Sequence, residues 1–140
     1  MSTVNADNIA VADTLTVGKG ILSASPIAGI GYTTGAGSSA TQASVKSSAF
    51  TLNAATGQIT FANDALVGSC TTSSATWTNS AIATNDVVMF NHISGGSIGK
   101  YIFNAQCSAG TAVLRVTNIG TVSLSEAPVV AFAVIKGAIS

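Results

Sequence analysis

Charged residues are scarce in this chain of 140 residues. They make up 7% of it, and five basic residues balance five acidic ones, whereas about a quarter of an ordinary soluble domain is charged. Ser and Thr, 35 in all, supply part of the polar surface. The remaining apolar surface favours association with other subunits. The few basic residues are widely scattered, so we expect no cationic groove for nucleic acid.

Long apolar runs are also missing. No stretch approaches the roughly 18 consecutive apolar residues that a membrane-spanning helix requires. Residues 1–15 lack the basic and apolar regions of a secretory signal peptide. We therefore expect neither a membrane partner nor export.

Cysteine and histidine are rare. Cys70 and Cys107 are 37 positions apart, and two separate buried thiols are favoured over a disulfide, which remains the alternative. Together with the single histidine, His92, they fall short of the four ligands of a structural zinc site. No metal and no cofactor is expected.

Residues 1–40 differ from the rest of the chain because they are rich in glycine and show only one periodic stretch. In that stretch Ile9, Val11, Leu15 and Val17 share one face of a strand. We predict an extended N-terminal arm with one strand over residues 1–40, lying on a neighbouring subunit through these four residues. Residues 41–140 are predicted to form the folded β-domain.

Short β-prone runs recur about every 10 to 15 residues after residue 41, with no stretch of helical period between them. Phe50 and Leu52 are expected to face Ile59 and Phe61 in a hairpin. A strand around Trp77 follows, and further strands are predicted at residues 86–91, 100–107, 111–118 and 129–136. This pattern predicts an all-β fold, an antiparallel β-sandwich or jelly-roll-like domain.

The last predicted strand is apolar on both of its alternating faces. One face carries Val130, Phe132 and Val134. The other carries small and branched residues, namely Val129, Ala131, Ala133 and Ile135. A strand that is covered on both sides lies within a sandwich or at a subunit interface. We predict that this second face is an interface.

Candidate catalytic groups are few. His92 would need a nucleophile and an orienting carboxylate such as Asp86, and the favoured interpretation is a strand-end histidine bonded to the backbone. The five carboxylates could in principle supply a glycosidase pair. Two of them, Asp7 and Asp13, lie in the predicted arm, and the other three stand at predicted turns, namely Asp64, Asp86 and Glu126. The glycine cluster at residues 94–100 does not fit a phosphate-binding loop and reads as a turn. We expect no catalytic residues and no enzyme activity.

Four phrases of the sequence are more specific than its periodicity: GYTTGAG at residues 31–37, TLNAATGQIT at 51–60, DVVMFNHISGG at 86–96 and SLSEAPVVAFAVIKGA at 123–138. Over residues 30–140 the chain closely resembles a small structural module that recurs in bacteriophage virion proteins. Cys70 and Cys107 depart from the small or hydroxyl residues usual in that module.

The resemblance implies a viral structural protein that works in the virion as a symmetric oligomer, and it leaves the position in the particle open. We expect the chain to be made in the host bacterial cytoplasm, and the leading hypothesis places it on the outer surface of the capsid. A homotrimeric capsid decoration protein, also called a cement protein, would bridge subunits of the major capsid protein. The alternative is a tail or head fibre protein that binds a host-surface receptor, with loop residues 94–99 presented to a glycan. Copy number per particle distinguishes the two.

Overall fold

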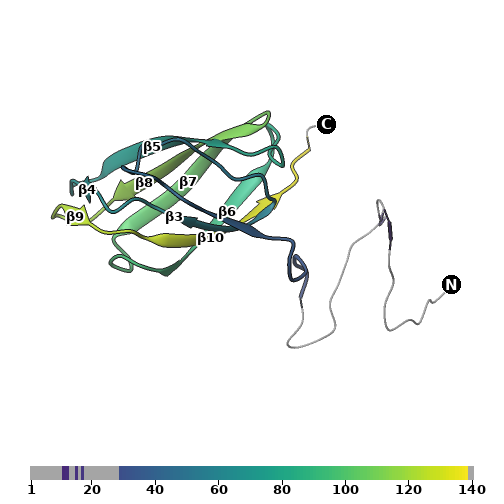
Figure 1. Cartoon of the computed structure of the whole chain (residues 1–140), viewed down its shortest axis with the longest axis horizontal. Helices are drawn as coiled ribbons and strands as arrows, with labels where there is room; N and C mark the ends of the chain where they lie inside the picture. The colour runs from purple at the N-terminus through teal and green to yellow at the C-terminus, as the bar shows by residue number, and fades with distance from the viewer. Residues whose placement is uncertain (1–10, 13–14, 16, 18–28, 139–140) are drawn as a thin grey trace. The chain divides into compact units, whose positions relative to one another are not determined.

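The computed structural model describes residues 11, 12, 15, 17 and 29–138. The chain divides into two units, Met1–Gly31 and Tyr32–Ser140. In the first unit, Val11, Leu15 and Val17 are exposed, and the predicted interface residue Ile9 lies outside the described residues. The strands described below all belong to the second unit (Figure 1). The expected domain boundary at residue 40 falls within its first strand.

The described part of the chain is all-β and contains no helix. Its ten strands are β1 (Ser38–Thr41), β2 (Phe50–Thr51), β3 (Thr56–Thr60), β4 (Ala65–Leu66), β5 (Thr71–Thr78), β6 (Val87–Ser94), β7 (Tyr101–Ser108), β8 (Thr111–Asn118), β9 (Leu124–Ser125) and β10 (Val129–Ile135). The predicted strands at residues 86–91, 100–107, 111–118 and 129–136 and around Trp77 are confirmed as β6, β7, β8, β10 and β5.

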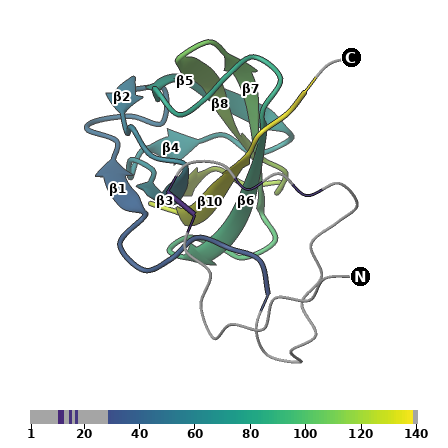
Figure 2. The same ribbon diagram turned by 90° about the vertical axis from the view of Figure 1, so that its right-hand side faces the viewer.

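Two four-stranded sheets form the second unit, an arrangement consistent with a β-sandwich. The first sheet has the order β1-β3-β10-β6 and the second β2-β5-β8-β7, while β4 and β9 form a separate two-stranded ribbon. Figure 2 shows the two sheets as separate layers. Most neighbours are antiparallel, but β1 pairs with β3 and β2 with β5 in parallel, so the prediction of a purely antiparallel domain is wrong for these two pairs.

The hydrophobic core lies between the two sheets because each long strand alternates inward apolar residues with outward ones. Strand β10 contributes Val130, Phe132 and Val134, and β8 contributes Ala112, Leu114 and Val116. Trp77 of β5 is fully buried and packs edge-on against Phe132, with ring centroids 4.8 Å apart. A buried aromatic pair of this kind is worth about 0.5–1.5 kcal/mol beyond its buried area.

The predicted hairpin of residues 49–61 is wrong, because β2 and β3 belong to different sheets. Phe50 stacks on Trp77, and the Trp77 indole N–H donates to the carbonyl of Leu52 at 3.1 Å. The Asn79 side chain accepts from the amide of Ala54 at 3.1 Å and donates to its carbonyl at 2.7 Å. These contacts hold β2 on the second sheet, and the chain crosses to the first sheet before β3.

Candidate functional site

The predicted interface residues of the last strand share the outer face of β10. Val129, Ala131 and Ala133 are half-buried there and Ile135 is 52% exposed. Their alternation partners Val130, Phe132 and Val134 are buried in the core. The strand therefore has one face in the core and a second, equally apolar face on the outside of the sheet.

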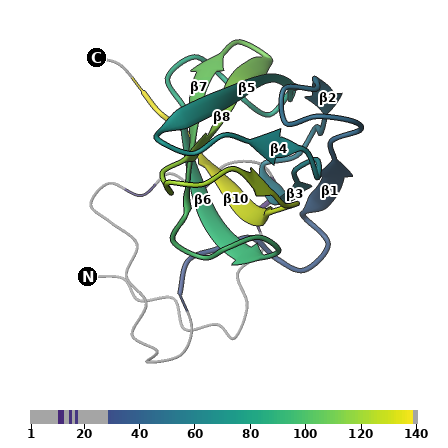
Figure 3. The same ribbon diagram turned by 90° about the vertical axis from the view of Figure 1, so that its left-hand side faces the viewer.

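Strand β6 extends this apolar surface because it pairs with β10 at the edge of the sheet (Figure 3). Its outward residues Val87, Met89 and Ile93 are 54%, 58% and 42% exposed. Val87 lies opposite Ile135, and Met89 lies opposite Ala133. Sequence reasoning missed these three residues, although the alternation in VVMFNHI would have marked them. We call the outward residues of β6 and β10 together the β6–β10 face.

The outer face of the second sheet is different in chemistry. Its outward positions carry hydroxyl, amide and guanidinium groups together with two apolar residues: Thr72, Ser74, Thr76 and Thr78 on β5, Val113, Arg115 and Thr117 on β8, and Ile102, Asn104, Gln106 and Ser108 on β7. Thr72 and Thr117 share a hydrogen bond of 2.8 Å, and Arg115 donates to Gln106 at 3.2 Å. A sheet face in water is normally polar in this way. The β6–β10 face is therefore more apolar than the outer face of the second sheet.

The loop of residues 94–100 leaves the end of β6 and crosses to β7. Gly95, Gly96 and Gly99 have φ angles of +61°, +68° and +77°, a conformation that glycine adopts without a steric penalty. A Cβ on Gly95 would collide with the carbonyl oxygen of Ala127. The predicted turn is confirmed, and it is packed directly against the segment before β10.

Glu126 fastens this loop. One carboxylate oxygen accepts from the amide of Ser97 at 2.8 Å and from the Tyr101 hydroxyl at 2.9 Å, and the other accepts from the Ser97 hydroxyl at 2.8 Å. The hydrogen bonds from Ser97 hold the pKa of Glu126 below its ordinary value of 4.5. Burial, reinforced by the Glu126 carboxylate, raises the pKa of Tyr101. Glu126 thus holds the loop at Ser97, in its middle, and at Tyr101, which directly follows it.

His92 lies on the inward side of β6, close to this loop. Its Nε2 atom is bonded to the carbonyl oxygens of Ser94, at 3.1 Å, and Gly95, so this nitrogen is the donor. The ring packs edge-on against Phe103 at 5.6 Å between centroids. The interpretation as a strand-end histidine bonded to the backbone is confirmed. The Ser97 hydroxyl is directed to Glu126 rather than to this ring.

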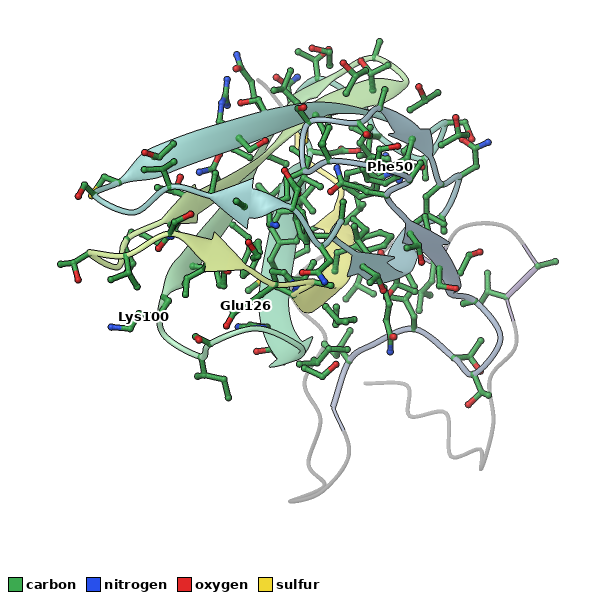
Figure 4. All side chains as sticks on the ribbon, turned by 60° about the vertical axis from the view of Figure 1, so that its left-hand side comes forward. Phe50, Lys100 and Glu126 are labelled. Carbon is green, nitrogen blue, oxygen red and sulfur yellow. The ribbon has the colours of Figure 1, made fainter. Side chains whose placement is uncertain are left out.

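The tip of the loop is exposed and mixed in character. Ile98 is 85% exposed, more than any other large apolar residue described. Lys100 closes the turn through its amide, which donates to the carbonyl of Ser97 at 3.2 Å, and its side chain projects away from the strands (Figure 4). The loop therefore presents one apolar and one cationic side chain on a backbone that Glu126 holds in place.

Lys46 forms a second polar cluster, which the sequence did not predict. Its side chain is buried, and the ammonium donates to the carbonyl of Ala62 at 2.8 Å, to the carbonyl of Asp64 and to Oδ1 of Asp64 at 3.1 Å. Gln42, also buried, donates to the carbonyl of Lys46 at 3.0 Å. The cluster fixes the chain between β1 and β4, because a buried charge needs partners on every side.

Asp86 pairs with Lys136 at the start of β6. The carboxylate accepts from the ammonium at 2.6 Å, from the amide of Ala83 at 2.8 Å and from the amide of Gly137 at 3.1 Å. The hydrogen bond from Lys136 is the main cause that lowers the pKa of Asp86. Of the candidate carboxylates, Asp7 and Asp13 lie outside the described residues. The three others, Asp64, Asp86 and Glu126, share no hydrogen-bond partner with one another.

The thiols of Cys70 and Cys107 are free, as predicted. Cys70 is exposed, so the expectation that both are buried is wrong for this residue. It directly precedes β5, in an exposed turn where both Ser69 and Cys70 have positive φ angles, 62° and 64°. Cys107 is half-buried on β7, where burial raises the pKa of its thiol.

Across residues 29–138 and the few described before them, no group of three or more His, Cys, Asp and Glu side chains is placed to hold a metal ion. The same residues include no helix long and apolar enough to cross a membrane. Comparison of the chain with protein-family models, with curated proteins and with solved structures gives no match.

Proposed function

We propose that this chain is a non-enzymatic structural subunit of a bacteriophage particle, a capsid decoration protein that stabilises the head by bridging major capsid subunits. The observation that carries this proposal is the β6–β10 face, an apolar surface without a charged side chain on the outside of a sheet. Exposed apolar patches of this kind mark surfaces that other proteins cover.

The sequence adds the second line of support. Four phrases resemble a virion module, and two of them, at residues 86–96 and 123–138, contain the strands of the β6–β10 face. A decoration protein works by adding buried area across joints between capsid subunits, in many copies that match the capsid symmetry. In this proposal the working form is a homotrimer, and residues 1–40 act as an arm on a neighbouring subunit through Ile9, Val11, Leu15 and Val17.

An electron-microscopy reconstruction of the particle that carries this chain tests the proposal. Hundreds of copies on the outer capsid surface are expected. A few copies at the tail or on a head fibre would replace decoration by the alternative, a fibre protein that binds a host-surface receptor. The feature that favours this alternative is the exposed tip at Ile98 on a loop fixed by Glu126.

The role of the arm has its own test. Removing residues 1–30 should leave the strand content unchanged by circular dichroism, because the described strands begin at Ser38, and should abolish attachment to particles that lack the chain. Attachment of the shortened chain at full strength would show that the arm has no such role.

A further inference from the structure

The two sides of the β-domain differ in the length of their edge strands. On one side the edges are β1 and β2, with four and two residues, and on the other they are β6 and β7, with eight residues each. Strand β7 contains no charged residue and no proline, and it pairs with β8 without a bulge over its whole length. Short strands, charges, prolines and bulges are the features that keep an edge from pairing. The free edge of β7 is therefore open to a further strand.

The inner side of β7 is incompletely covered. Its inward residues Phe103, Ala105 and Cys107 are half-buried, whereas the inward residues of the adjacent β8 are only 1% exposed. The difference arises because β8 has a neighbouring strand on each side and β7 has one on a single side. A further strand at this edge would complete the burial of these three residues.

Arg115 of β8 gives the outer side of this edge a positive charge. It is the one charged side chain on the strands of the second sheet, and its guanidinium donates to the Gln106 side chain of β7 at 3.2 Å. Neither of the two ion pairs among the described residues includes it. The edge of β7 therefore suits a strand that carries a carboxylate on its outer side.

The N-terminal segment Ile9–Val17 has the matching pattern. Its branched apolar residues alternate along the segment, and its one charged residue, Asp13, stands in the middle of the same face. Val11, Leu15 and Val17 are 46%, 62% and 42% exposed in the single chain, so this segment has apolar surface still to bury. Residues 18–31 connect it to the β-domain and reach up to about 50 Å when extended, about twice the length of an eight-residue strand.

We propose that residues Ile9–Val17 of a neighbouring copy add to the free edge of β7 as a fifth strand of the second sheet. In the register that we assign, Asp13 lies beside Asn104, which is itself opposite Arg115, so the carboxylate meets the guanidinium. The free edge of β6 offers no lysine or arginine for Asp13. The contact rests on the proposed role of the arm and names the surface that receives it.

The same register suits the residues on either side of Asp13. Val11 and Leu15 stand on the outer face, and one of them lies beside the exposed Ile102 whichever way the strand runs. The inward positions next to Asp13 are Ala12 and Thr14, whose small side chains fit where the edges of β6 and β7 approach each other. The nine residues of the segment match the length of β7.

Sedimentation of the full-length chain tests the contact. The chain alone has a mass of 13.8 kDa, and a multiple of that mass is expected at micromolar concentration. Asp13→Arg and Arg115→Asp should each raise the dissociation constant on the order of tenfold, because each places like charges together. The double variant should associate within about threefold of the unmodified chain. Asp7→Arg is the matched control, with the same change of charge outside the segment, and should associate normally.

Hydrogen exchange locates the strand on the β-domain. Amides of residues 101–108 should exchange more slowly at concentrations where the chain associates, because an added strand bonds to the free edge. Val11→Pro removes one backbone donor and should abolish both the protection and the association. Circular dichroism of each variant should be unchanged, since the described strands begin at Ser38 and Arg115 lies on the outer face.

Four results would overturn the proposal: a monomeric unmodified chain, a double variant no better than the single ones, protection at residues 87–94 in place of 101–108, and β7 protection that is the same at every concentration. The last of these would show that the arm covers its own domain. Failure of the proposed function is distinguishable. An oligomer that depends on Asp13 and Arg115 but is absent from virions would remove the virion role and leave the contact standing.

Discussion

The hydroxyl of Tyr101 donates a 2.9 Å hydrogen bond to the carboxylate of Glu126. Tyr101 is the first residue of β7 in one sheet, and Glu126 stands between β9 and β10, just before the chain enters the other sheet. This bond therefore ties the two sheets together at the end where residues 94–100 cross between them. Because Ser97 bonds to the same carboxylate, the connection depends on the ionised form of Glu126.

Replacing Tyr101 by phenylalanine should destabilise the domain without changing its fold. The variant loses one hydrogen bond to a charged acceptor, and we expect the free energy of unfolding to fall by about 1–2 kcal/mol. Urea unfolding at neutral pH, followed by the fluorescence of Trp77, measures this change. An unchanged midpoint and slope would mean that the bond contributes nothing across the sheets.

The stability of the domain should fall on acidification through the same carboxylate. Hydrogen bonds from Ser97 lower the pKa of Glu126 in the folded state, so the unfolded chain takes up a proton at higher pH than the folded one. Stability from this group is therefore complete above the ordinary pKa of 4.5 and is lost as the pH falls through the folded value.

Glu126→Gln is the variant that isolates this effect. It resembles the protonated acid, so it should be less stable than the unmodified chain at pH 7 and lose less stability between about pH 5 and pH 3. Part of the acid dependence remains, because Lys136 lowers the pKa of Asp86 as well. Two parallel curves of unfolding free energy against pH would contradict the assignment.

The long strands could be predicted from the sequence because their alternation is a local property. Strand β8 was expected at residues 111–118 and lies at Thr111–Asn118, and β10 differs from its prediction by one residue. In both strands every second residue faces the core, so the pattern of burial can be read without knowledge of the neighbouring strands.

Strand partners could not be predicted in the same way. Phe50 and Ile59 are close in sequence and both apolar, which favoured a hairpin, yet Phe50 lies opposite Trp77 and Ile59 opposite Val130. The choice depends on distant side chains, the Trp77 indole and the Asn79 amide, whose hydrogen bonds hold residues 52 and 54. Such bonds leave no periodic signal.

The candidate surface was predicted in part. Because both faces of β10 are apolar, the sequence predicted a surface formed by Val129, Ala131, Ala133 and Ile135. The neighbouring outward residues of β6 could be added only once the pairing of the two strands was known. The fastening of the loop by Glu126 was missed because an isolated Glu before proline also fits an ordinary turn. The burial of Lys46 was missed because lysine is almost never buried unless it is paired.

The Lys46–Asp64 pair should contribute more to stability than the Asp86–Lys136 pair. Lys46 is fully buried, so Asp64→Ala leaves a buried ammonium with only carbonyl partners, and we expect a loss of about 2–4 kcal/mol. Lys136 is 66% exposed at its side chain. The buried Asp86 carboxylate that Lys136→Ala leaves behind keeps the amides of Ala83 and Gly137 as donors, so this variant should lose less stability than Asp64→Ala. Denaturant unfolding of both variants gives the comparison. Equal losses would show that burial of Lys46 does not set the difference.

The two cysteines should differ in reactivity in the folded protein. Cys70 is exposed, whereas Cys107 is half-buried and its thiol has a raised pKa, chiefly through burial and also through the Asp86 carboxylate. Since the thiolate is the reactive form, a thiol reagent at neutral pH should modify Cys107 more slowly than Cys70. The Cys70→Ser variant isolates the slow reaction. After unfolding without reductant both thiols should react at similar rates, and failure of both to react in that state would show a disulfide.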